Sequence, residues 1–328
     1  MPREKNNRLG TTKEYPSLTA WTSTALIEAK GEKMDRTKGI GGSDVAAICG
    51  VSPWKTPLQL YLEKIGESAG SPDNPAMAYG RMVEPVILQW YEQYTGQTVA
   101  VPGPLQHPRY SYLIAHLDGL TPDRVIEIKT ARSSADWGDP GTDQIPVYYQ
   151  TQVQFYMMMA GRTITDLPVS FHGTMPEIYT IREDAEIQKM LLEICIKFWE
   201  SVQKRHVPAA VNVADIIALH GRKSMAAQVL ASAEVEAAVQ SYIGLQRQVK
   251  SLEAEQETFK FQILQAMGES DTLIGLDGTP LCTWKKSKDS AILDKKRFQT
   301  EQPELFRQYL VNKPGYRSFL IKTTKRGV

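Results

Sequence analysis

The pentapeptide Val-Ile-Glu-Ile-Lys at residues 125–129 constrains the fold of this chain more than any other segment. Apolar and polar residues alternate along it, so on a β-strand Glu127 and Lys129 point to one side while Ile126 and Ile128 point to the other. One side then belongs to a hydrophobic core, and the other is free to carry chemistry. The pattern predicts a strand with an acid and a lysine next to each other on its polar side.

A turn at Pro122-Asp123 makes this strand one arm of a β-hairpin. Such a turn pairs residue 120 with 125, 119 with 126 and 118 with 127, which places Asp118 directly opposite Glu127. The Cβ atoms of opposed residues lie about 4.5–5.5 Å apart. Two carboxylates that close repel each other unless a cation joins them, and hard oxygen ligands suit Mg²⁺ or Mn²⁺. The hairpin therefore predicts a metal-dependent phosphodiesterase, and a solvated strand with a Glu–Lys pair is the plainer alternative.

The spacing of Asp118, Glu127 and Lys129 resembles the core of the PD-(D/E)XK nuclease superfamily. Four more segments resemble its YqaJ-type viral recombinase branch, whose best-known relatives are lambda-type phage exonucleases. They read Arg36-Thr-Lys-Gly-Ile-Gly-Gly-Ser43-Asp44, Ser52-Pro-Trp-Lys-Thr-Pro57, Gly80-Arg-Met-Val-Glu84-Pro85 and Tyr149-Gln-Thr-Gln152-Val-Gln154. A set of motifs in order is more specific than any one of them. The resemblance implies an α/β (α+β) fold with a restriction-endonuclease-like core, a small mixed sheet flanked by helices.

The same resemblance assigns roles at the hairpin. Asp118 and Glu127 would bind one or two Mg²⁺ ions, for which Mn²⁺ would substitute, and the backbone carbonyl of Ile128 would be a further ligand. Lys129 would position the attacking water or help to deprotonate it. His116 precedes Asp118 by two residues and is an additional candidate ligand, although an ordinary strand histidine is the favoured interpretation.

Two helices are expected to bring polar groups to the same site. Apolar residues recur at helical spacing over residues 77–94, where Pro85 predicts that the helix begins or kinks beside Glu84. The resemblance places Glu84 in the active site; the residues alone would allow a surface acid at a helix start. A second helix is predicted over residues 145–161, and the resemblance selects its Gln152, with Tyr149 in support.

The glycine-rich turn at residues 39–44 precedes a short apolar helix, which Ser43 or Asp44 is expected to cap. In the lambda-type relatives the arginine before this turn and the serine within it hold the 5′-phosphate of the DNA end. Arg36 and Ser43 fall on those positions. Trp54 follows in a loop, where it could stack on a terminal base or belong to the core.

Composition narrows the class of protein. A hydrophobic fraction of 42% and a charged fraction of 23% are ordinary for a soluble globular chain. No apolar run reaches the roughly 18 residues of a membrane span, and the polar N-terminus does not resemble a signal peptide. We therefore expect no membrane association and a location in the cytoplasm of a bacterial host. Cys49, Cys195 and Cys282 lie far apart, which supports neither a disulfide framework nor a zinc site.

The 328 residues are predicted to form a nuclease core with an appendage. The expected divisions are a mobile lead-in at 1–20, with a helix over 21–33 opening the core at 21–207, a hinge at 208–221 and the appendage at 222–328. Within the core, residues 169–172 and 177–182 read as paired strands, followed by a helix over 184–204.

A heptad seam runs along a helix expected at about residues 230–267 of the appendage. Its positions alternate in steps of three and four and hold Val235, Ala238, Tyr242, Leu245, Val249, Leu252, Gln256, Phe259 and Ile263. A seam of about four repeats predicts a coiled-coil-like arm. It could pack on another helix of this chain or on a second copy, and we favour packing within the chain.

The last part of the chain is expected to be a basic α/β tail. It should contain a hairpin with its turn at Asp277-Gly278, helices over residues 293–310 interrupted at Pro303, and a strand over 316–322. From residue 281 onward there are 12 Lys or Arg against 4 Asp or Glu. Basic tails favour polyanions, so we expect contacts with duplex DNA here. The candidate residues are Lys285, Lys286 and Lys288.

The combined expectation is a phage or prophage recombination enzyme that trims one strand of a DNA duplex from its 5′ end. It would leave a 3′ overhang for a single-strand annealing protein. Relatives form rings around DNA, so a homo-oligomer is a further expectation. An endonuclease with the same catalytic residues and a non-catalytic DNA-binding or assembly protein are the two alternatives.

Overall fold

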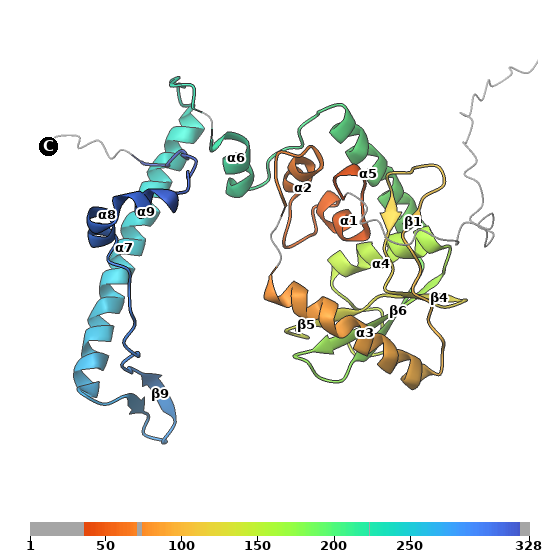
Figure 1. The fold of residues 1–328 in the computed structure, drawn as a ribbon, viewed down its shortest axis with the longest axis horizontal. Helices are drawn as coiled ribbons and strands as arrows, with labels where there is room; N and C mark the ends of the chain where they lie inside the picture. Colours follow the sequence, from red (N-terminus) through yellow and green to blue (C-terminus); the bar gives the residue numbers. More distant parts are fainter. Residues whose placement is uncertain (1–35, 71–73, 223, 322–328) are drawn as a thin grey trace, which may run out of the picture. The chain divides into compact units, whose positions relative to one another are not determined.

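A computed structural model describes residues 36–70, 74–222 and 224–321, and for Arg36 it describes only the backbone (Figure 1). The chain divides into two compact units, with the boundary between Ile216 and Ile217. The predicted lead-in at 1–20 and the helix predicted over 21–33 lie outside the described residues. No helix in the described part is both long and apolar enough to cross a membrane.

The first unit is a mixed α/β structure. Its helices are the 3₁₀ turn η3 (Arg36–Lys38), α1 (Gly42–Ile48), α2 (Pro57–Lys64), α3 (Pro75–Thr95), α4 (Val147–Ala160) and α5 (Ala185–Gln203), with α6 (Val213–His220) across the boundary. Its strands are β1 (Leu105–Gln106), β2 (Ile114–Ala115), β3 (Gly119–Leu120), β4 (Arg124–Ile126), β5 (Lys129–Ala131), β6 (Ile164–Phe171) and β7 (Glu177–Arg182). The helix predicted over 145–161 and the paired strands with the helix after them are confirmed.

A small mixed sheet around β6 organises this unit. β7 runs antiparallel along one edge of β6, and β4 and β5 run parallel along the other. Ile126 of β4 pairs with Asp166, and Lys129 of β5 pairs with Val169, so both stretches keep one register. They are two parts of one strand, interrupted at Glu127 and Ile128. The predicted fold class, a small mixed sheet flanked by helices, is confirmed.

The predicted hairpin is present at the start of this strand. Gly119 pairs with Ile126 and Leu120 with Val125, as the turn at Pro122-Asp123 required. The N–H of Thr121 closes the turn by donating to the carbonyl of Arg124 at 2.9 Å. The third predicted pair, 118 with 127, is not part of the ladder, because the strand pairing ends before it.

The helices cover both faces of the sheet (Figure 1). Ile87 and Tyr91 of α3 pack against Ile126 and Ile128 in one hydrophobic cluster. Because successive side chains of a strand point to opposite faces, residue 127 faces away from α3, and it meets Gln152 of α4 there. α4 is buried along residues 151–159, and α1 and α5 pack against it.

The start of α3 corrects one expectation. The helix begins at Pro75, where the Asn74 side chain caps it by accepting from the N–H of Met77 at 3.0 Å, and Pro85 lies inside the helix. The prediction that the helix begins at Pro85 is therefore wrong. Asn at the N-cap followed by proline is a stronger start signal. An internal proline costs about 3 kcal/mol, and the buried contacts of Ile87 and Tyr91 offset this cost.

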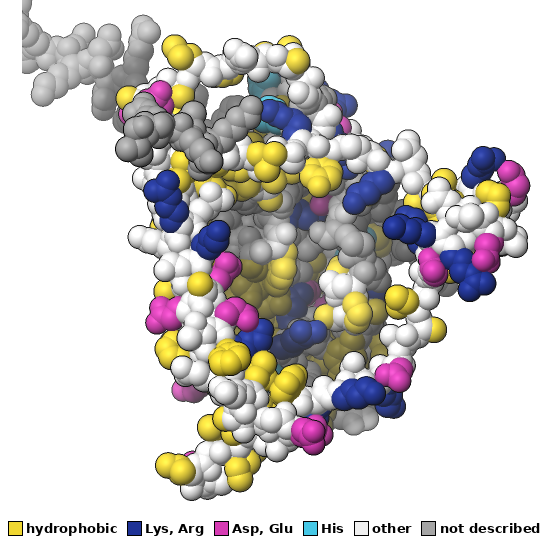
Figure 2. Space-filling view, turned by 90° about the vertical axis from the view of Figure 1, so that its left-hand side faces the viewer, with side chains coloured by type: hydrophobic (Ala, Val, Ile, Leu, Met, Phe, Trp, Pro, Cys, Tyr) yellow, Lys and Arg dark blue, Asp and Glu magenta, His cyan; other side chains and the backbone are white. Residues whose placement is uncertain are grey.

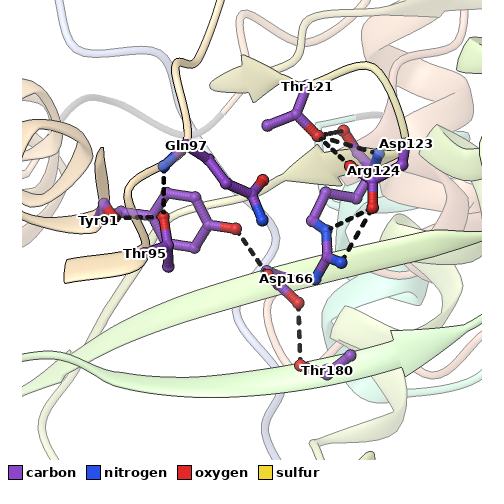
Figure 3. Close-up of polar contacts among 8 residues, drawn as sticks. All are labelled: Tyr91, Thr95, Gln97, Thr121, Asp123, Arg124, Asp166 and Thr180. Carbon is purple, nitrogen blue, oxygen red and sulfur yellow. Dashed lines mark hydrogen bonds and ion pairs between the residues drawn. The ribbon is translucent and has the colours of Figure 1, made fainter. Parts of the chain in front are cut away.

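The buried carboxylate of Asp166 joins three elements of the unit (Figure 3). It accepts hydrogen bonds from Tyr91 Oη of α3 at 2.6 Å, from Arg124 Nη1 of β4 at 2.8 Å and from Thr180 Oγ1 of β7 at 2.9 Å. Arg124 also pairs with Asp123 of the turn at 3.0 Å. Burial and the Asp166 carboxylate raise the pKa of Tyr91. These contacts fix the hairpin and α3 on the sheet.

Replacing Tyr91 with phenylalanine should lower the free energy of unfolding by about 1.5 kcal/mol, since one hydrogen bond to a charged acceptor is lost while two others remain. Urea unfolding measures the effect. Tyr94→Phe, an exposed tyrosine on the same helix, is the matched control and should change little. Equal effects of the two substitutions would show that the Asp166 contacts do not stabilise the fold.

Part of the predicted hinge at 208–221 is anchored to the first unit. Asp215 of α6 is buried, and its carboxylate accepts from Thr56 Oγ1 at 2.8 Å and from the N–H of Val211 at 3.0 Å. Thr56 is also the N-cap of α2. The beginning of α6 is therefore tied to α2.

The second unit contains α7 (Ala233–Met267), β8 (Thr272–Ile274), β9 (Pro280–Thr283), α8 (Lys295–Glu301) and α9 (Pro303–Gln308). The predicted helical arm is present, and so is the predicted hairpin, with Gly278 at φ 83° in its turn. The interruption at Pro303 is confirmed, because α8 ends at Glu301 and α9 begins at Pro303.

The strand predicted over 316–322 is wrong for its described part. Residues 316–321 form no strand, and Lys322 lies outside the described residues. The segment packs on α7 instead: the Phe319 ring meets the Tyr242 ring edge-on at 5.9 Å. The N–H of Arg317 donates to the carbonyl of Gly221 at 2.8 Å.

The heptad seam is exposed, so the expectation that it packs within the chain is wrong for the described residues. Its apolar members, including Val249, Leu252 and Phe259, are mostly more than half exposed. Figure 2 shows hydrophobic side chains on the surface of the second unit among charged ones. In the described part of the chain, the other helices wholly within this unit are α8 and α9, and their seven and six residues cannot cover a helix of 35.

Candidate active site

A pocket of about 510 Å³ opens in the first unit beside the hairpin. Many of the residues singled out from the sequence line it: Ser43, Trp54, Glu84, His116, Asp118, Glu127, Ile128, Lys129 and Gln152. They come from α1, the loop after it, α3, the β2–β3 connection, the β4–β5 strand and α4. Segments far apart in the sequence therefore meet at one place.

Glu127 lies at the interruption between β4 and β5 and is only 2% exposed. Its Oε1 accepts from Lys129 Nζ and from Gln152 Nε2, the latter at 2.8 Å. Its Oε2 is buried and has no hydrogen-bond partner among the described residues. A buried acceptor without a partner costs about 1–3 kcal/mol, and more when it is charged. Hydrogen bonds therefore hold Oε1 in place, whereas Oε2 has no donor among the described residues.

Asp118 lies directly before β3, and its Oδ2 accepts from the N–H of Ile128 at 2.8 Å. This bond holds Asp118 beside the strand that carries Glu127, although the two residues are not a ladder pair. The next residue, Gly119, leaves room for Val99, because a Cβ at position 119 would lie 2.4 Å from Val99 Cγ1.

Burial and neighbouring charge hinder the ionisation of the acids in the pocket. Burial and the nearby charge of Asp118 raise the pKa of Glu127 to about 8. Burial also raises the pKa of Asp118, although the Lys129 charge and the Ile128 N–H oppose this. The pKa of Glu84 is raised as well, first by burial and then by Asp118. The pocket therefore holds three acids that ionise reluctantly.

Lys129 is the cation among these acids. Burial alone would lower its pKa, but the carboxylates of Glu127 and Asp118 outweigh burial, and the pKa is raised. Lys129 Nζ also lies 5.3 Å from the centre of the Tyr149 ring, within cation–π range. The ammonium group is thus held at the pocket wall between an acid and an aromatic face.

The donor set suits a hard divalent cation only in part. Among the residues that the structure describes, no three His, Cys, Asp or Glu side chains are gathered closely enough to hold a metal ion. The predicted larger ligand set with Glu84 and His116 is therefore not assembled as a cluster. Asp118 and the spare oxygen of Glu127 nevertheless fit such an ion, since hard oxygen donors beside each other suit Mg²⁺ or Mn²⁺.

Trp54 lies at the surface, 66% exposed, so its assignment to the core is wrong. Its ring meets the Tyr148 ring edge-on at 4.8 Å and lies 6.4 Å from the Tyr149 ring. The three rings form an aromatic wall beside Lys129. An exposed aromatic face next to a pocket is suited to stacking on a base.

The glycine-rich turn differs from its prediction. The N-cap of α1 is Gly41, not Ser43 or Asp44. Asp44 accepts from the N–H of Gly41 at 3.1 Å and from Lys64 Nζ at 2.7 Å, so it fastens the turn to α2. Ser43 is exposed at the pocket wall. The side chain of Arg36 lies outside what the structure describes.

The lysines of the tail, Lys285, Lys286 and Lys288, follow β9 in the second unit and are exposed. Lys286 lies 3.7 Å from Asp289. Their contact with DNA stays a prediction.

Tyr156 is a pocket residue that the sequence did not select for the site. Its hydroxyl accepts from Gln152 Nε2 at 3.2 Å, and its ring lies against Gly42, where a Cβ would come within 2.2 Å of Tyr156 Cε1. Its position four residues after Gln152 was the available signal, because such residues share a helix face. Trp137, which contacts the Tyr149 ring at 5.5 Å, carried no signal because it lies in a loop.

Comparison with known proteins agrees with the motifs in the sequence. The fold is a small mixed sheet flanked by helices, with two acids and a lysine from one hairpin at a pocket. Residues 33–163 match the family model of the YqaJ-like viral recombinase domain. The match confirms, for this part of the chain, the resemblance to the YqaJ-type branch that the motifs predicted.

Among curated proteins, the chain is 27% identical over 303 residues to the uncharacterized protein YqaJ of Bacillus subtilis (strain 168), covering 88% of this chain and 92% of that protein. It is 24% identical over 164 residues to the uncharacterized protein R354 of Acanthamoeba polyphaga mimivirus, covering 46% of this chain and 29% of that protein.

Among solved structures, the alkaline exonuclease LHK-Exo of Laribacter hongkongensis has a TM-score of 0.44 and 21% identity, covering 52% of this chain and 90% of that one. A phage-related exonuclease of Haemophilus somnus 129PT has a TM-score of 0.38 and 11% identity, with coverages of 51% and 96%.

Proposed function

We propose that this protein is a metal-dependent DNA nuclease that digests one strand of a duplex from its 5′ end. The observation that carries the proposal is the buried Glu127 carboxyl, whose spare oxygen faces no donor among the described residues, beside the second acid Asp118. Negative charge builds up on the phosphate when a phosphodiester is hydrolysed, and it must be stabilised. A pocket with three acids and one lysine needs a further cation to stabilise that charge.

In the proposed reaction Asp118 and Glu127 hold one or two Mg²⁺ or Mn²⁺ ions, which would neutralise the scissile phosphate and the leaving oxygen. Lys129 orients the attacking water. Its positive charge stabilises the negative charge that the water acquires as it attacks. Gln152 keeps Glu127 Oε1 in place, so the acid presents its other oxygen to the pocket. Glu84 lines the pocket within electrostatic reach of Asp118 and belongs to the same constellation.

The direction of digestion is a finer part of the proposal. Arg36 and Ser43 would bind the 5′-phosphate, and a guanidinium fork suits phosphate oxygens. The aromatic wall with Trp54 would stack on the terminal base. The products would be a 3′ overhang, handed to a single-strand annealing protein, and mononucleotides. The assignment of a nuclease core at 21–207 and a DNA-gripping appendage at 222–328 belongs to the same proposal.

The test is to offer three DNA substrates in Mg²⁺ and in EDTA. They are a linear duplex with 5′-phosphates, the same duplex without them, and a covalently closed circle. We expect digestion of the linear duplexes in Mg²⁺ only, faster with the 5′-phosphate, and loss of a 5′ label before a 3′ label. Cleavage of closed circles would show that the protein is an endonuclease and not an exonuclease. Binding without digestion of any substrate would favour a non-catalytic DNA-binding protein.

A further inference from the structure

The heptad seam of α7 is an apolar stripe, interrupted at Gln256, whose layers from Leu245 to Phe259 nothing in the described part of the chain covers. In heptad notation, with residue 235 at position a, the a positions hold Val235, Tyr242, Val249, Gln256 and Ile263, and the d positions hold Ala238, Leu245, Leu252, Phe259 and Ala266. All of them lie on one helix that begins at Ala233 and ends at Met267. A stripe of this regularity needs a partner helix of similar length.

We propose that this partner is α7 of a second copy of the chain, and that the two helices form a parallel, two-stranded coiled coil. The dimer does not depend on the reaction in the pocket. It follows from three features of the seam.

The first feature is the shape of the seam side chains. Three a positions hold β-branched residues, Val235, Val249 and Ile263, and two central d positions hold leucine. β-branched residues at a with leucine at d favour two parallel strands, since this combination packs best in the dimer geometry. Leu252 is 63% exposed in the single chain, so it has most of its surface to bury.

The second feature is charge complementarity beside the seam. Glu255 occupies a g position and Lys260 the following e position. In a parallel pair, the g residue of one helix faces the next e residue of the other. Glu255 of each copy would therefore face Lys260 of the other, which gives two attractive pairs. An antiparallel pair would instead set g against g and e against e.

The third feature is a single polar layer. Gln256 is the one polar residue among the seam positions. In a parallel pair in register it would face Gln256 of the second copy, where the two amides can hydrogen-bond to each other. Any shift of register would place this amide against an apolar layer. One polar residue at an a position is a known way to fix register.

The chain itself offers little competition for the seam in its described part. The Phe319 ring touches Tyr242, which keeps 44% of its surface exposed. Cys282 Sγ contacts Met267 Sδ at 3.7 Å, at the end of α7 and off the seam. The central layers from Leu245 to Phe259 thus stay available.

The first experiment measures the mass of the full-length protein by sedimentation equilibrium over a concentration series. Leu252→Glu places a charge in the seam, and Ser251→Glu places the same charge one residue earlier, on the outer side of the helix. We expect a dimer for the unaltered chain and for Ser251→Glu. The dimer of Leu252→Glu should be weaker by at least about a hundredfold, because two buried leucines are lost and two acids face each other. Circular dichroism checks that both variants keep their helix content.

The second experiment tests the parallel arrangement by exchanging charges. Glu255→Lys and Lys260→Glu should each weaken the dimer roughly three- to tenfold, since each turns two attractive pairs into repulsive ones. The double variant should recover the affinity of the unaltered chain, because only a parallel pair brings these two positions together.

Three outcomes would overturn the proposal. They are a monomer at every soluble concentration, equal association of Leu252→Glu and Ser251→Glu, and two single charge variants that the double variant does not rescue. The last outcome would reject the parallel arrangement even if the chain is a dimer.

Discussion

Replacing Asp118 with asparagine should lower the rate of DNA digestion by roughly a thousandfold while the protein stays folded. The side chains have nearly the same shape, and the amide oxygen can still accept from the N–H of Ile128 as Asp118 Oδ2 does at 2.8 Å. What is lost is one negative charge beside Glu127. If that charge holds the catalytic cation, its removal costs several kcal/mol of transition-state stabilisation, and about 1.4 kcal/mol corresponds to tenfold in rate.

The same hairpin supplies a matched control. Asp123→Asn removes the same charge five residues later, at the exposed turn, where Asp123 pairs with Arg124 and accepts from Thr121 Oγ1. Digestion by this variant should stay close to that of the unaltered protein. Thermal unfolding of all three proteins separates a chemical effect from an effect on folding.

Binding of Mn²⁺, measured by calorimetry without DNA, gives a second readout for Asp118. The Asp118→Asn protein should bind the ion much more weakly than the Asp123→Asn protein does. A folded Asp118→Asn protein that digests DNA at the unaltered rate would remove the basis of the proposed function.

The hairpin around Asp118 could be predicted because its signals are local. Alternation along residues 125–129 fixes which side chains share a face, and the turn at Pro122-Asp123 fixes the register of the ladder. The same local logic found the start of α5 near Asp184 and the helix restart at Pro303. Each depends on residues that are close in sequence.

The errors came from contacts between distant residues. Asp44 was expected at the N-cap, but Gly41 holds that position, and the Asp44 carboxylate accepts from the Gly41 N–H and from Lys64 of α2. Pro85 was expected to start or kink a helix, and the start is wrong because packing of α3 on the sheet carries the helix through it. The heptad seam showed that α7 needs a partner, yet a periodic pattern does not say which helix supplies it.

The site was predictable in its composition but not in its electrostatics. The sequence indicated that Asp118, Glu127 and Lys129 would meet, and the pocket contains all three. It did not indicate that Glu127 would be buried with one oxygen held and the other without a donor in the described structure. That arrangement depends on Gln152, 25 residues away in the sequence. Burial of this carboxyl has a consequence for stability.

Replacing Glu127 with glutamine should make the metal-free protein more stable at pH 8 and leave it nearly unchanged at pH 5. The folded state raises the pKa of Glu127 from 4.5 to about 8, first through burial and then through Asp118. A carboxyl with a raised pKa binds more protons in the folded than in the unfolded state, so stability falls as pH rises from about 4.5 to about 8. Glutamine does not titrate, and its variant lacks this loss.

The size of the effect is on the order of a few kcal/mol, since each pKa unit corresponds to about 1.4 kcal/mol. The raised pKa already includes the opposing effect of Lys129. Urea unfolding in EDTA at pH 5, 6.5 and 8 measures it. Glu193→Gln, an exposed acid on α5, is the control and should follow the unaltered protein at each pH. If the stability of Glu127→Gln equals that of the unaltered protein at each pH, the fold does not raise the pKa of Glu127.

Adding Mg²⁺ or Mn²⁺ at pH 8 connects this stability difference to the proposed function. An ion that binds the two carboxylates favours the ionised form of Glu127 and stabilises only the folded state. The unaltered protein should therefore gain stability from the ion and approach the Glu127→Gln variant, whereas the variant should gain little. In the unaltered protein the gain should grow from pH 5 to pH 8, because at low pH the ion must displace a proton from Glu127. A gain of equal size in both proteins would mean that the ion binds elsewhere.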